Sequence, residues 1–117
     1  MSAELALVVI KSPDIQNLKA FYEEIGIEFK EERHGEGPLH YSANLNGIIF
    51  EIYPQKIGTK PSKGAPIGFK VKNLETVLNQ KLILHSIEII EPLEKTEWGN
   101  RVVIKDPDGR RVELYES

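Results

Sequence analysis

Apolar and polar residues alternate along this chain in short blocks that turn residues separate. The continuous apolar run over 5–10 is typical of a buried strand. The next residues favour the start of a helix, because Ser12 can cap it, Pro13 suits the first helical position and Asp14 interacts well with the positive end of the helix dipole. Apolar residues then recur at helical spacing until Gly26, which is placed to end the helix: Ile15, Leu18, Phe21, Tyr22 and Ile25.

The rest of the first half predicts three strands. A strand over 26–32 leads into a Gly-rich loop over 33–38, in which we expect His34 to face solvent. The segments 39–45 and 48–53 are separated by Asn46-Gly47, a strong hairpin signal because both residues tolerate positive φ. The order of elements predicted for this half is β-α-β-β-β.

The second half predicts the same order. A strand over 67–71 precedes a helix that Asn73 caps, and a further strand covers 87–90. The segments 98–105 and 110–115 form a predicted hairpin across Asp106-Pro107-Asp108-Gly109, in which Pro and Gly stand at favourable turn positions.

An internal repeat relates the two halves. The residues 47–53 and 109–115 share the pattern Gly-x-x-x-Glu-(Ile/Leu)-Tyr and lie 62 positions apart (47 to 109). We therefore expect a single α+β domain of paired βαβββ modules, each a curved sheet with a helix on its convex face. Module 1 covers about 1–55, a linker about 56–65, and module 2 about 66–117.

The charge and the cysteine content of the chain argue against several classes of partner and site. The chain of 117 residues has 15 Lys and Arg against 18 Asp and Glu, and this mild acidity argues against a nucleic-acid partner. The absence of cysteine excludes disulfides and thiolate metal sites and is compatible with the cytoplasm, where we expect the protein to be located. The start lacks the basic region of a signal peptide, and no apolar run approaches the roughly 20 residues that cross a membrane.

Alternation along the strands predicts a half-polar surface on module 1. If Asn46-Gly47 is a two-residue loop, position 42 lies opposite Glu51 and position 40 lies opposite Tyr53. The surface opens away from the helix, which Ile48, Phe50 and Ile52 cover. The side chains expected on this surface are His40, Ser42, Asn44, Glu51 and Tyr53.

The same reasoning predicts a mixed aromatic and polar surface on module 2. If 106–109 forms the loop, position 102 lies opposite Glu113, and Val112 and Leu114 face the helix. Two such surfaces curving towards each other would make a cleft, the usual form of a ligand site. The side chains expected here are Trp98, Asn100, Val102, Ile104, Arg111, Glu113 and Tyr115.

Three segments carry a resemblance to a known family. Phe21-Tyr22-Glu23-Glu24-Ile25-Gly26 closes the first helix, Glu97-Trp98-Gly99 precedes the seventh strand, and Asp106 to Leu114 combines the turn with the glutamate. On these segments the chain resembles the vicinal oxygen chelate superfamily, which includes glyoxalase I, bleomycin-resistance proteins and extradiol dioxygenases. The resemblance implies paired βαβββ modules assembled as a homodimer, with clefts between modules.

The resemblance also implies positions for metal ligands. Glyoxalase I typically uses a His or Gln on each first strand and a Glu on each last strand. In this chain the last-strand positions hold Glu51 and Glu113, but the first-strand positions fall on Leu7 and Pro66, which cannot bind a metal. We therefore expect no metal cofactor. The alternative is a divalent ion held by Glu51, Glu113 and His40.

Three functions remain open. The first is a metal-free protein, similar to the bleomycin-resistance branch, that binds a small polar-aromatic ligand in a cleft. The second is a metal-dependent lyase, isomerase or dioxygenase with an altered ligand set, and the third is an interaction module without a small ligand. Trp98 either stacks on a ligand or fills the module interface. The ligand-binding residues expected for the first function are Glu51, Glu113, His40, Tyr53, Trp98 and Asn100.

Overall fold

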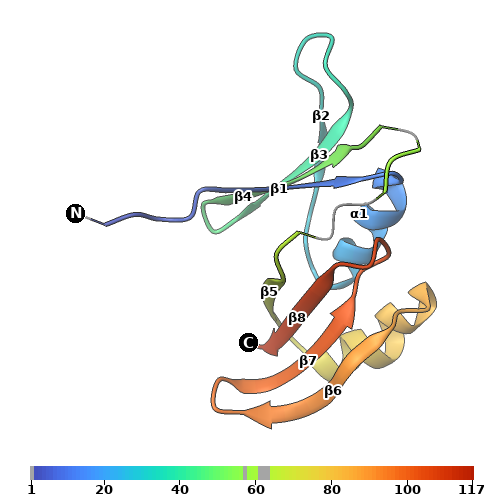
Figure 1. Ribbon diagram of the computed structural model, residues 1–117. Helices are drawn as coiled ribbons and strands as arrows, with labels where there is room; N and C mark the ends of the chain where they lie inside the picture. Colours follow the sequence, from blue (N-terminus) through green and yellow to red (C-terminus); the bar gives the residue numbers. More distant parts are fainter. Residues whose placement is uncertain (1, 57, 61–63) are drawn as a thin grey trace.

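The computed structural model describes residues 2–56, 58–60 and 64–117, which form two four-stranded sheets (Figure 1). The expected linker falls partly on residues 57 and 61–63, which lie outside the described residues. In the first sheet the strand order is β1-β4-β3-β2, with β1 parallel to β4. Its elements are β1 (Leu7–Ser12), α1 (Ile15–Glu24), β2 (Lys30–Glu32), β3 (His40–Leu45) and β4 (Ile48–Pro54).

The second sheet repeats this arrangement. Its strand order is β5-β8-β7-β6, and β5 runs parallel to β8. The two sheets confirm the predicted α+β fold of paired βαβββ modules. The elements are β5 (Ile67–Val71), α2 (Leu74–Thr76), a π-helical turn (Val77–Lys81), a 3-10 turn (Leu82–His85), β6 (Ile89–Thr96), β7 (Gly99–Lys105) and β8 (Arg111–Glu116).

The caps of both helices differ from those predicted. Asp14, not Ser12, caps α1, because its side chain accepts the N–H of Asn17, while Ser12 Oγ accepts the N–H of Asp14. Asn73 adopts a left-handed conformation and makes no capping side-chain bond within the described residues. Instead, the carboxylate of Glu116 accepts the first N–H of α2 from the end of β8.

The first hairpin confirms the predicted register. Asn46 and Gly47 have φ angles of 54° and 95°, as a two-residue turn of this type requires. Leu45 pairs with Ile48, and Ser42 pairs with Glu51. The side chains on each face of β3 and β4 therefore follow the sequence prediction.

The second hairpin has a different register from the one predicted. Lys105 pairs with Arg111, so the loop contains five residues and Val103, not Val102, lies opposite Glu113. The prediction that Val102 and Ile104 share a surface with Glu113 is therefore wrong, and both belong to the core instead. The Asp106 carboxylate explains the longer loop, because its Oδ1 atom accepts the N–H groups of Asp108 and Arg110.

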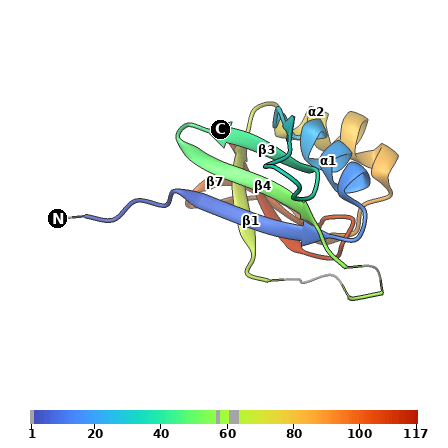
Figure 2. The same cartoon turned by 90° about the horizontal axis from the view of Figure 1, so that it is seen from above.

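Aromatic side chains from both modules form one core. The ring of Tyr22 on α1 lies 5.3 Å from Phe50 of the first sheet and 5.7 Å from Phe69 of the second. Phe50 and Phe69 also contact each other, with ring centroids 5.7 Å apart. Figure 2 shows α1 side by side with the helical segment 74–85, which α2 and the two turns after it form, and the centroid of the Phe21 ring lies 6.2 Å from that of His85. The two modules therefore share a core on their helix-covered sides.

A buried polar network also joins the modules. Tyr22 donates its hydroxyl hydrogen to Asp106 Oδ2 at 2.8 Å, and Arg110 binds the same oxygen at 3.0 Å. Arg110 also donates to the main-chain carbonyl of Lys11 at the end of β1. Burial first, and then the charge and hydrogen bond of Asp106, raise the pKa of the Tyr22 phenol well above its usual value.

We expect Tyr22→Phe to lower the free energy of unfolding by about 1.5–3 kcal/mol, the range for a hydrogen bond to a charged group. The raised pKa keeps Tyr22 protonated in the folded chain, whereas the unfolded phenol ionises near pH 10. Stability from this group is therefore constant below about pH 10 and falls above it, and the variant should show a smaller alkaline loss. Urea unfolding from pH 7 to 11 measures both effects.

Tyr115→Phe is the matched control for this measurement. Its hydroxyl also binds a carboxylate, Glu113 at 2.8 Å, but Tyr115 is only partly buried and its partner lies on the same strand. Equal losses in the two variants would contradict the importance of the buried network.

Candidate functional site

The face of the first sheet that points away from α1 carries the candidate site. His40 and Tyr53 stack on this face with ring centroids 4.0 Å apart and planes inclined by 11°. Glu51 lies beside them, since its Oε2 is 3.7 Å from His40 Nε2. The structure therefore brings together three of the residues selected from the sequence, whose role in ligand binding stays a prediction.

An apolar strip borders these polar groups. Val9 on β1 pairs with Glu51 on β4, so it lies next to the carboxylate, and Leu7 precedes it on the same face. Both remain exposed, Leu7 to 52% and Val9 to 43%. The face thus combines an acceptor, a stacked aromatic pair and open apolar surface.

His40 is the most buried polar group of this face, with 1% of its side chain exposed. Its Nδ1 lies 3.2 Å from the carbonyl oxygen of Pro38, and its Nε2 lies 3.5 Å from Glu32 Oε1. Among the described residues Nε2 has no hydrogen-bond partner. Burial, together with the charges of Glu51 and Glu32, raises the pKa of the Tyr53 phenol, which is therefore a neutral donor at pH 7.

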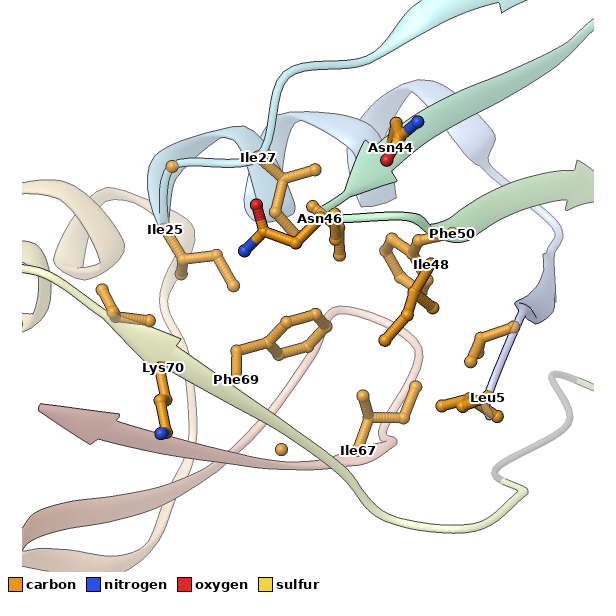
Figure 3. A pocket seen from close by; sticks show the side chains of 15 residues that line it. Leu5, Ile25, Ile27, Asn44, Asn46, Ile48, Phe50, Ile67, Phe69 and Lys70 are labelled. Carbon is orange, nitrogen blue, oxygen red and sulfur yellow. The ribbon is translucent and has the colours of Figure 1, made fainter. Parts of the chain in front are cut away.

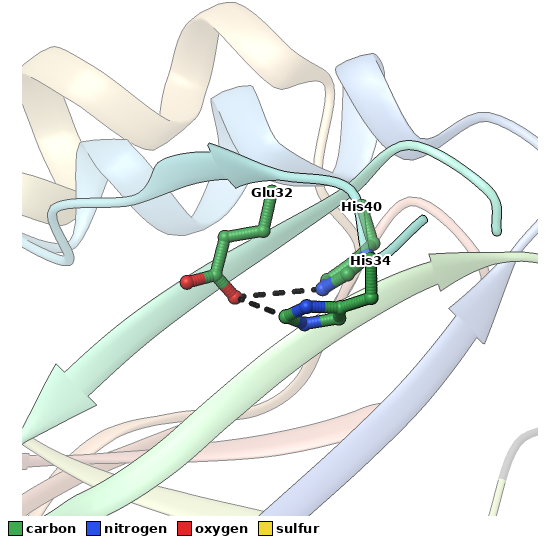
Figure 4. A group of neighbouring side chains, drawn as sticks. All are labelled: Glu32, His34 and His40. Atoms are coloured by element: carbon green, nitrogen blue, oxygen red, sulfur yellow. Dashed lines mark ion pairs between the residues drawn. The ribbon is translucent and has the colours of Figure 1, made fainter. Parts of the chain in front are cut away.

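The sequence did not indicate two further members of this cluster. Glu32 ends β2 and pairs across the sheet with His40, while His34 lies in the following loop with its ring 5.1 Å from that of His40. His34 is exposed as predicted, but Figure 4 shows that it points to the same Glu32 oxygen as His40. Burial acts to raise the pKa of Glu32. The hydrogen bond and the charge of Lys30, together with the nearby rings of His34 and His40, outweigh burial, so the pKa is lowered.

The equivalent face of the second sheet has different chemistry. Glu113 lies 3.6 Å from Arg101 and 3.6 Å from Arg111, and it accepts a hydrogen bond from Tyr115. Arg101 also binds Glu91 at 2.8 Å. Glu113 is therefore neutralised by arginines, whereas Glu51 faces the imidazole of His40.

Trp98 and Asn100 lie away from the surface that carries Glu113. Trp98 is in the turn between β6 and β7, and 70% of its side chain is exposed. Asn100 alternates with Arg101 along β7, so it lies on the opposite face from Glu113. The longer Asp106 loop accounts for this difference, since it shifts the register of β7 by one residue.

One hollow between the modules lies on their helix-covered sides. It has a volume of about 450 Å³, and Figure 3 shows Phe50, Phe69 and Ile67 pointing into it. Neither Glu51 nor Glu113 lines it. In a single chain, this hollow is therefore not the acidic cleft predicted from the sequence.

Comparison of the sequence with models of known protein families identifies the family of this chain. The model of the glyoxalase-like domain matches residues 4–117, almost the whole chain. This chain belongs to the glyoxalase-like domain family. No curated protein matches the chain.

Solved structures of glyoxalase-like proteins have the same fold. A glyoxalase family protein from Enterococcus faecalis is 28% identical, with a TM-score of 0.67 over 97% of both chains. A glyoxalase/bleomycin resistance protein/dioxygenase family enzyme from Burkholderia phytofirmans PsJN is 16% identical, with a TM-score of 0.71 over 96% of this chain and 97% of the other. The second likeness concerns the fold alone.

In this glyoxalase-like domain the metal-ligand positions implied by resemblance are incomplete. Leu7 lies on the same face as Glu51 but offers no donor atom, and neither does Pro66 before β5. The ligating side chains that cluster among the described residues are Glu32, His34 and His40, a group that does not include Glu113. Also within the described residues, no helix is long and apolar enough to span a membrane.

The exposure of Trp98, the one tryptophan of the chain, can be tested directly. We expect acrylamide to quench its fluorescence nearly as strongly in the native protein as in urea, because water reaches most of the indole. Strong protection in the native protein would show that another molecule or another copy covers the β6–β7 turn.

Proposed function

We propose that this protein binds a small ligand on the open face of the first sheet. The observation that carries the proposal is the stacked His40–Tyr53 pair beside Glu51, on a face that is otherwise partly apolar and exposed. Polar groups that converge on apolar surface are the usual composition of a ligand site.

The chemistry of the face favours a particular class of ligand. Glu51 is an acceptor with only 15% of its side chain exposed, so a donor or cationic group of the ligand would bind it in a partly dry environment. The exposed Leu7 and Val9 would cover a flat apolar or aromatic body. We infer a ligand with a planar body and a positively charged or hydrogen-bond-donating end.

In the binding that we propose, Glu51, His40 and Tyr53 contact the ligand directly. No metal at the family positions takes part, since Leu7 and Pro66 cannot ligate one. A metal-dependent lyase, isomerase or dioxygenase is the second candidate, favoured by the proximity of His40 to Glu51. An interaction module without a small ligand is the third. We keep the cytoplasm as the proposed location.

We also propose that a second copy of the chain closes this open face. Leu5, Leu7 and Val9 form an exposed apolar strip on and before the edge strand β1. Exposed apolar surface at a sheet edge is typical of a protein interface, and pairing with a copy of itself is the commonest way to cover it.

Benzamidine tests the proposed ligand class, because its planar ring ends in an amidinium that fits a carboxylate. We expect it to raise the melting temperature of the protein in the presence of a chelator, since a ligand that binds only the native state stabilises it. Benzoate, which has the same shape and the opposite charge, should have no effect.

Two glutamine variants locate the binding. Glu51→Gln should weaken benzamidine binding about tenfold or more, the cost of losing a charge-assisted hydrogen bond. Glu113→Gln should bind as the unaltered protein does, because arginines already occupy Glu113. Equal stabilisation by benzamidine and benzoate would contradict a site at Glu51. If neither compound stabilised the protein, the result would favour the interaction module.

Sedimentation velocity at micromolar concentration tests the assembly. We expect a dimer for the unaltered chain and a monomer for Val9→Lys, because a charge in the apolar strip must lose its water on association. Leu84→Lys is the control, since Leu84 is also apolar and is more exposed than Val9 (78% against 43%) but lies in the 3-10 turn Leu82–His85. Dissociation by Leu84→Lys alone would place the interface on the helices instead.

A further inference from the structure

Glu32, His34 and His40 form a cluster that the proposed function does not use as a unit. Glu32 ends β2, His40 begins β3, and His34 lies in the loop between them (Figure 4). One ligand atom from each lies within 4.8 Å of the others. The Glu32 Oε1 atom is 3.5 Å from His40 Nε2 and 3.9 Å from His34 Nε2.

These separations are close to those around a bound metal ion. Nitrogen and oxygen ligands lie about 2.0–2.2 Å from zinc, so two ligands of a tetrahedral site are roughly 3.3–3.6 Å apart. The Glu32–His40 separation of 3.5 Å falls in this range, and the 3.9 Å between Glu32 and the exposed His34 is a few tenths of an ångström longer. The sheet fixes the two closer ligands, since Glu32 and His40 are paired residues of neighbouring strands.

The buried nitrogen of His40 is an independent sign of a missing partner. Its Nδ1 can donate to the carbonyl of Pro38, the second-shell bond that commonly orients a metal-binding imidazole. In that tautomer Nε2 presents a lone pair to two carboxylate oxygens, Glu32 at 3.5 Å and Glu51 at 3.7 Å. A buried acceptor that faces only acceptors is unfavourable unless a cation or a proton lies between them.

We propose that Glu32, His34 and His40 bind a divalent transition-metal ion of the zinc type. Two imidazoles and a carboxylate suit zinc and its neighbours better than calcium or magnesium, which prefer oxygen ligands. The exposed side of His34 gives the ion a path from solvent. This site differs from the family positions at Leu7 and Pro66 and goes beyond the ligand binding proposed above.

Titration of the chelator-treated chain with zinc tests the proposal. We expect one equivalent to bind, with the imidazole NMR signals of His34 and His40 shifting and those of His85 unchanged. Cobalt in place of zinc should give the visible absorption of a four- or five-coordinate ion. Histidine 34 is the best position to alter, because its exposed side chain can be removed without disturbing the core, as thermal melts would verify.

His34→Ala and Glu32→Gln should each weaken zinc binding by more than the 10–100-fold that loss of an outer-shell partner costs. His85→Ala is the matched control, because His85 contacts Glu24 in a different part of the fold and should leave the affinity unchanged. No stoichiometric binding, or equal affinity in His34→Ala and the unaltered chain, would overturn the proposal.

Loss of zinc binding in Glu113→Gln but not in Glu32→Gln would also overturn it, because the ion would then lie on the second sheet. The benzamidine measurement is made with a chelator present, so it can succeed when the metal proposal fails and fail when the metal proposal succeeds. The two proposals are therefore tested separately.

Discussion

The buried carboxylate of Asp106 is the constraint on which the rest of this structure depends. Within its own loop it accepts two main-chain N–H groups, and this fixes a five-residue turn between β7 and β8. Through Arg110 and Tyr22 it also binds the first module, at the end of β1 and on α1. Removing one member of such a buried pair is costly, because the remaining charge has lost its water.

This turn determines which side chains of the second sheet reach its open face. With five residues in the loop, Arg101 and Val103 join Glu113 on that face, while Val102 enters the core. The equivalent glutamates of the two modules therefore have opposite surroundings. Glu113 is balanced by arginines, and Glu51 faces the imidazole of His40, so chemistry concentrates on the first sheet.

The sequence predicted the fold where local signals were sufficient. Asn46-Gly47 gave the register of the first hairpin, and with it the juxtaposition of His40 and Glu51. The predicted register of the second hairpin was wrong because the length of its loop depends on hydrogen bonds to the Asp106 side chain. Rules based on the spacing of turn residues do not include such bonds. The sequence did not indicate that Glu32 and His34 join His40, because the loop between β2 and β3 brings these residues together only in the folded sheet. The pairing of Glu32 with His40 could have been inferred only from the bounds of β2.

Both charged side chains of the Asp106–Arg110 pair at the module junction come from the second module. At the offset of 62 that relates the repeats, the counterparts of Asp106 and Arg110 are Asn44 and Ile48, which carry no charge. The two halves are therefore no longer interchangeable, although their strands follow the same plan. A tandem of two first halves would have to assemble without an ion pair at this position. An isolated second half would expose Asp106 and Arg110, and Asp106 would lack the hydrogen bond that Tyr22 donates.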